Sequence, residues 1–124
     1  MALAIAGPAA AAQLAGSEWR PTELDGIDVP SGSEIFVRFG GKNKIEGHGG
    51  CNRFLGAYKL AGSNIAIGPL ATTRMACPEP IMEREARFLR ALENSRQFMR
   101  NRIDLSLTDN AGMIIARLLQ TDAD

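Results

Sequence analysis

Short segments in which apolar and polar residues alternate, separated by glycine turns, constrain the fold of this chain more than any other feature. The clearest covers residues 34–41, EIFVRFGG, where Ile35, Val37 and Phe39 fall on one face of an extended strand. Comparable segments occupy residues 16–26, 44–48, 56–69, 103–107 and 113–119. Because glycine is also abundant, with 13 in 124 residues, the pattern predicts many short strands joined by tight turns.

Helical periodicity is found after Pro78, over about residues 79–94. Pro80 suits the first turn of a helix, and Glu79 suits its positive end. We expect an apolar stripe of this helix to face the core, made of Met82, Ala86, Leu89 and Leu92, flanked by Ile81, Glu85 and Phe88. Four methionines are interpreted as core filling: Met75, Met82, Met99 and Met113. One main helix among many strands predicts an α+β domain, with a mostly antiparallel sheet that curves into a barrel-like shape.

The first residues differ in composition from the rest. Residues 1–12, MALAIAGPAAAA, form an apolar run that ends in small residues, as secretory signal peptides do, although no basic residue precedes Arg20. The run is too short to span a bilayer as a helix, and no cysteine follows it closely to carry a lipid anchor. An alanine-rich extension is the alternative. We predict a signal-peptide-like segment at 1–12, one domain at 13–124, and a periplasmic or secreted protein.

The two cysteines, Cys51 and Cys77, admit several interpretations. A catalytic thiolate needs a base, and the single histidine, His48, is three residues from Cys51, a spacing that rarely gives a fixed geometry in a loop. A zinc site would require four ligands, and the sequence around Cys77 offers one. A further alternative is that both cysteines are free, buried thiols. The even count and the signal-like start favour a disulfide, which would connect the entry of the helix to the sheet.

Polar residues accompany both cysteines: Asn52, Arg53, Thr72, Thr73 and Arg74. If the disulfide forms, these side chains come together as a candidate recognition patch for a carboxylate or a phosphate, which the planar arginine side chain binds well. Alternatively, Asn52 only stabilises a turn and the arginines cover apolar surface with their aliphatic stems.

The two cysteine segments, GGCNRFLGAYKL and IGPLATTRMACPEP, resemble those of the META domain family, which includes the heat-shock-inducible HslJ-like proteins. The likeness extends from about Leu14 to Leu119 and includes an early tryptophan, Trp19, and a closing hairpin. It implies a compact α+β fold with a barrel-like sheet, an envelope or secreted setting, and a link to stress response in bacteria. The family has no established reaction, substrate or cofactor. Many members resemble lipoproteins. This chain departs from them because no cysteine follows its apolar run closely enough to carry a lipid.

These observations predict a non-catalytic exported or envelope domain, associated with stress response, that binds a protein or a small ligand. We assign no catalytic residue, metal ligand or cofactor, and we expect a monomer. The 14 basic and 14 acidic residues cancel, which argues against nucleic acid as a partner. The alternative is a small hydrolase or metal-dependent enzyme with an unidentified active site. An enzyme should show a deep polar pocket whose ionisable groups have perturbed pKa values.

Overall fold

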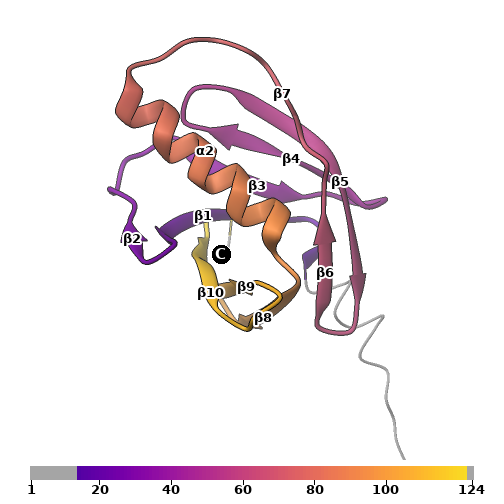
Figure 1. Cartoon of the computed structure of the whole chain (residues 1–124). Helices are drawn as coiled ribbons and strands as arrows, with labels where there is room; N and C mark the ends of the chain where they lie inside the picture. Colours follow the sequence, from indigo (N-terminus) through magenta and orange to yellow (C-terminus); the bar gives the residue numbers. More distant parts are fainter. Residues whose placement is uncertain (1–13, 123–124) are drawn as a thin grey trace, which may run out of the picture.

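A computed structural model describes residues 14–122, so the predicted signal-like segment lies outside the described residues. Between Ser17 and Gln120 the chain forms ten strands and one helix (Figure 1). The strands are β1 (Ser17–Leu24), β2 (Ile27–Asp28), β3 (Ile35–Phe39), β4 (Lys44–Gly49), β5 (Arg53–Ala61), β6 (Asn64–Ile67), β7 (Ala71–Thr72), β8 (Gln97–Asn101), β9 (Asp104–Thr108) and β10 (Ile114–Gln120). The helix, α2, spans Glu79–Asn94, which confirms the predicted range.

Eight of these strands form a closed antiparallel barrel. Around the barrel they follow the order β1, β3, β4, β5, β6, β8, β9 and β10, and β10 closes it by pairing with β1. Two short strands lie outside this path: β2 pairs with β1, and β7 pairs with β5. The prediction of an α+β domain with a curved, barrel-like antiparallel sheet is therefore confirmed.

Apolar side chains of the alternating segments fill the barrel, because every second residue of a strand points inward. Phe39 and Tyr58 meet inside it edge to face, with ring centroids 5.1 Å apart. The helix α2 contacts β1, β4, β6, β9 and β10, which lie on different sides of the barrel, so it covers an open end. There Phe88 of α2 packs against Phe54 of β5, with ring centroids 5.8 Å apart.

Two details of the predicted core are wrong. The buried residues of α2 are Glu85, Phe88, Ala91 and Leu92, so the buried stripe is rotated relative to the expected one, and Ala86 is exposed. Three of the four methionines are exposed, by 60% for Met75, 73% for Met99 and 65% for Met113. They occupy loops or outward strand positions, since aromatic and branched side chains already fill the barrel.

The alternating pattern did not predict β8. Its inward positions are Phe98 and Arg100, and the Arg100 guanidinium lies over the buried Trp19 ring, 5.0 Å from its centroid. A cation stacked on an aromatic face is a favourable way to place arginine against a core. A charged residue at an inward position interrupts the apolar alternation from which a strand is predicted.

Candidate functional site

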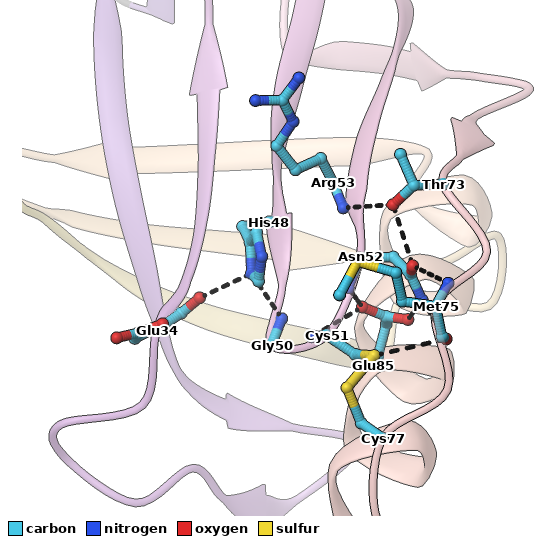
Figure 2. The surroundings of a disulfide bond; sticks show 10 residues. All are labelled: Glu34, His48, Gly50, Cys51, Asn52, Arg53, Thr73, Met75, Cys77 and Glu85. Atoms are coloured by element: carbon cyan, nitrogen blue, oxygen red, sulfur yellow. Dashed lines mark hydrogen bonds between the residues drawn. A yellow bond between two sulfur atoms is a disulfide. The ribbon is translucent and has the colours of Figure 1, made fainter.

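Cys51 and Cys77 form a disulfide at the helix-covered end of the barrel (Figure 2). Cys51 lies in the turn between β4 and β5, and Cys77 lies just before α2. Their Cα atoms are 6.0 Å apart, and 26 positions separate them in the sequence. In this structure neither sulfur is a thiol, so neither serves as a nucleophile or as a thiolate ligand.

A buried carboxylate from the helix holds the same turn. Glu85 is 6% exposed, and its Oε2 atom accepts hydrogen bonds from the backbone N–H groups of Cys51 (3.1 Å) and Asn52 (2.5 Å). Its Oε1 atom accepts a third from the Asn52 side-chain amide (2.9 Å). Backbone donors directed at a carboxylate stabilise its charge, which would otherwise be costly to bury. Glu85 therefore anchors the β4–β5 turn to α2.

Two glycines make room for this contact. A Cβ atom built on Gly49 would lie 2.7 Å from Glu85 Oε2, closer than a carbon can approach an oxygen without displacing it. Gly50 has a φ of 113°, a backbone conformation that other residues rarely adopt. The glycines before Cys51 thus serve two separate needs, space at Gly49 and backbone geometry at Gly50.

Asn52 links the turn to the segment that precedes the helix. It is 5% exposed, and its Oδ1 atom accepts hydrogen bonds from the Thr73 hydroxyl (2.9 Å) and the Met75 N–H (2.6 Å). Its amide group donates to Glu85 and to the Met75 carbonyl (3.3 Å). The Cys51 sulfur also lies 3.4 Å from that carbonyl oxygen; we describe this as a contact, because a half-cystine has no hydrogen to donate.

We call residues 68–77, which run from the end of β6 to the disulfide, the crossover strap. Near its start, Glu93 of α2 accepts a hydrogen bond from the Leu70 N–H (3.0 Å). In its middle, the Thr73 N–H donates to the Arg53 carbonyl (3.1 Å) and the Thr73 hydroxyl accepts from the Arg53 N–H (3.1 Å). Every residue from 71 to 76 is nevertheless exposed. The strap therefore combines a backbone fixed at several points with side chains that face solvent.

The five residues predicted as a recognition patch divide into two groups. Asn52 is buried, and the Thr73 hydroxyl is used in the network described above, so both hold the strap in place. The side chains of Arg53, Thr72 and Arg74 are exposed, and within residues 14–122 neither arginine forms an ion pair. The predicted patch thus consists of a structural group, Asn52 and Thr73, and an exposed group, Arg53, Thr72 and Arg74.

A groove of about 420 Å³ adjoins the exposed group on the outer wall of the barrel. It is lined by Phe36, Glu46, Gly47, Arg53, Phe54, Leu55, Ala71, Thr72 and Thr73, which come from β3, β4, β5, β7 and the strap. Leu55 is 64% exposed. Three of the predicted patch residues, Arg53, Thr72 and Thr73, thus line one hollow together with apolar residues and Glu46.

His48 stabilises the turn before Cys51, and the two residues with shifted pKa values do not line the groove. The Nδ1 atom of His48 accepts a hydrogen bond from the Gly50 N–H (3.0 Å), which stabilises the turn before Cys51. Burial raises the pKa of the Tyr58 phenol, far along β5. Burial alone would raise the pKa of Asp122, but hydrogen bonds and the nearby Arg38 lower it. Neither residue lines the groove, and residues 14–122 contain no group of three or more His, Cys, Asp or Glu arranged to hold a metal ion.

Sequence reasoning missed the role of Glu85. It placed this residue beside the apolar stripe of the helix without assigning it a partner. A carboxylate near a buried stripe needs hydrogen-bond donors, and a glycine-rich turn exposes backbone N–H groups that can supply them. A glutamate beside the buried stripe, together with a glycine-rich turn elsewhere in the chain, could therefore have indicated this contact from the sequence.

The fold and site of residues 14–122 define a small β-barrel domain whose helix α2 is attached to the sheet by a disulfide and a buried carboxylate. The chain belongs to the META domain family, whose model matches residues 12–122. Comparison with curated proteins finds no significant match. The described part of the chain has no helix with the length and apolar character needed to cross a membrane.

Three solved structures are similar to this chain. One is an NMR structure of a protein from Burkholderia xenovorans, 27% identical with a TM-score of 0.74, covering 99% of this chain and 95% of the other. A second NMR structure is 28% identical with a TM-score of 0.69, covering 88% of this chain and 93% of the other. A DUF4847 family protein from Bacteroides vulgatus is 12% identical with a TM-score of 0.70, covering 93% and 99%; at that identity the likeness concerns the fold alone.

Proposed function

We propose that this META domain is an exported, non-catalytic binding domain of the cell envelope or the secreted fraction, and that it supports stress tolerance, as the family resemblance implies. Its binding face comprises Arg53, Thr72 and Arg74 and the groove beside them. The observation that carries this proposal is the crossover strap, in which a fixed backbone presents exposed side chains. Such preorganisation lowers the entropic cost of binding a partner.

The chemistry around the groove favours binding over catalysis. The groove is lined by the exposed Leu55 and by the charged residues Arg53 and Glu46. The groups with shifted pKa values lie elsewhere. Exposed arginine beside apolar surface is typical of a surface that recognises another protein.

Photo-crosslinking tests the binding face. We would replace Arg74 with p-benzoylphenylalanine and irradiate the protein in envelope extract of its host. The matched control carries the same replacement at Lys59, an exposed cation farther along β5. We expect a discrete adduct from position 74 that excess unlabelled wild-type protein suppresses, and none from position 59. Equal adducts from both positions, or none from position 74, would contradict the proposed face.

Export is supported by the signal-like start and by the disulfide, because disulfides persist in oxidising compartments. Leu14 is completely buried, and its carbonyl accepts a hydrogen bond from the Ser17 hydroxyl. Cleavage must therefore leave Leu14 in place, a requirement that cleavage after Ala12 meets. Intact-mass analysis of protein from the fractionated host should find a chain that begins at Gln13 outside the cytoplasm. A cytoplasmic chain that retains residues 1–12 would refute export.

A further inference from the structure

The backbone of the crossover strap has a free side. Ala71 pairs with Leu55 of β5, and the Thr73 N–H donates to the Arg53 carbonyl. Because successive residues of a strand direct their N–H and C=O groups to opposite sides, Ala71 and Thr73 face β5. Thr72 and Arg74 then direct theirs away from the sheet. Within residues 14–122 no hydrogen bond engages the backbone of Arg74.

The outer wall next to this edge has two adjacent positions of different chemistry. Leu55 lies beside Ala71, whose small side chain leaves the leucine 64% exposed. Two pairs farther along, Arg53 lies beside Thr73 and has no ion-pair partner within residues 14–122. Arg74, the next residue along the strap, is also exposed and has no ion pair in that range. An apolar contact and a cationic contact are therefore available two residues apart along the edge.

We propose that the edge at Thr72–Arg74 binds an extended segment of a partner protein by β-strand addition. Main-chain hydrogen bonds to Thr72 and Arg74 supply the pairing. On the outer face, an apolar side chain of the added strand covers Leu55 beside Ala71. An acidic side chain two positions away lies near Arg53, since side chains two apart on a strand share a face.

The charge distribution favours an acidic residue at that position. The nearest acidic group of the groove is Glu46, which belongs to β4 and is separated from the strap by β5. An added strand would pair with the strap on its free side, and so it would lie nearer to Arg53, on β5, than to Glu46 on β4. This inference rests on the proposed function, because it names the class of partner for the same face.

Amide hydrogen exchange with two synthetic peptides tests the inference. The probe is Ac-TVTETV-NH2, whose glutamate lies two positions from a valine in both directions, and the control is Ac-TVTKTV-NH2. At millimolar probe, exchange should slow at the Thr72 and Arg74 amides, which point outward, and change little at Ala71 and Thr73, which are already hydrogen-bonded. The lysine control should bind about fivefold more weakly, the ratio expected for the loss of an exposed ion pair.

Charge reversal separates this pairing from general electrostatic attraction. Arg53→Glu should reverse the preference between the two peptides, whereas Lys59→Glu, an identical charge change on the same strand, should preserve it. Unchanged exchange at Thr72 and Arg74, or equal affinity for the two peptides, would overturn strand addition. Slowing of the same amides with protein concentration alone would also overturn it, because the occupant would then be a second copy of this chain. If strand addition fails while position 74 still crosslinks, the proposed function stands; if crosslinking fails, the face itself is wrong.

Discussion

Replacing Glu85 with alanine should destabilise the domain far more than replacing any exposed carboxylate of the same helix. Three donors bind this side chain: the N–H groups of Cys51 and Asn52 and the Asn52 amide. The amide keeps a second acceptor at Met75, so two buried backbone donors lose their partners. At roughly 1.5 to 2 kcal/mol for each lost bond to a charged group, the free energy of unfolding should fall by about 3 to 4 kcal/mol.

Two further variants calibrate this value. Glu85→Gln keeps one oxygen for the backbone donors but directs an NH2 group at the Asn52 amide, so it should cost about 1 to 2 kcal/mol. Glu83→Ala removes an exposed carboxylate two residues away on α2, and it should change the stability by less than about 0.5 kcal/mol.

Urea unfolding with linear extrapolation measures all three variants, and the denaturant slope should not change. The protein must be kept oxidised during the measurement. Loss of the disulfide, which closes a 26-residue loop, would by itself lower the stability by about 3.5 kcal/mol in the chain-entropy model. A Glu85→Ala variant within about 1 kcal/mol of Glu83→Ala would refute the conclusion that the carboxylate holds the turn.

Three other changes follow from the same geometry. Gly49→Ala should lower the free energy of unfolding by about 1 to 3 kcal/mol, because its Cβ would meet Glu85. Gly41→Ala should be tolerated, because a Cβ at that position would have no atom within 4 Å. Urea unfolding compares the two variants. Reduction of the disulfide should lower Tm by more than about 10 °C in a thermal scan, and a smaller change would contradict the loop-entropy estimate. Asp122→Asn should lower stability slightly at pH 7, because the pKa of Asp122 is lowered by folding. That contribution should disappear as the pH falls below about 4, and a difference that persists at pH 2 would count against it.

The sequence predicted those features that depend on local pattern. The range of α2 followed from Pro78, Pro80 and the change of period, and the barrel-like sheet followed from many short alternating strands with one helix to cover them. These signals are local because helix and strand periodicity arise within a few residues. The pairing of β10 with β1, which closes the barrel, joins residues about 100 positions apart and has no local signal.

The features that could not be predicted depend on contacts between distant segments. The buried stripe of α2 includes Glu85 because a turn some 34 positions earlier presents unpaired N–H groups at that place. Arg100 occupies an inward position of β8 because Trp19, on β1, offers an aromatic face. In each case the partner decides whether a charged residue is buried, and a single segment does not reveal its partner.

Of the two alternatives that the sequence left open for the polar residues beside the cysteines, the structural one holds for Asn52 and Thr73, and recognition stays a proposal for the others. The Asn52 side chain makes four hydrogen bonds and the Thr73 hydroxyl makes two, so both have structural roles. Arg53 and Arg74 are neighbours of these residues in the sequence, and yet their side chains form no ion pair within residues 14–122. The division follows the contacts: Asn52 and the Thr73 hydroxyl belong to the network that holds the strap, whereas the side chains of Arg53, Thr72 and Arg74 are exposed. The recognition hypothesis therefore depends on these exposed side chains, while the network determines how rigidly they are presented.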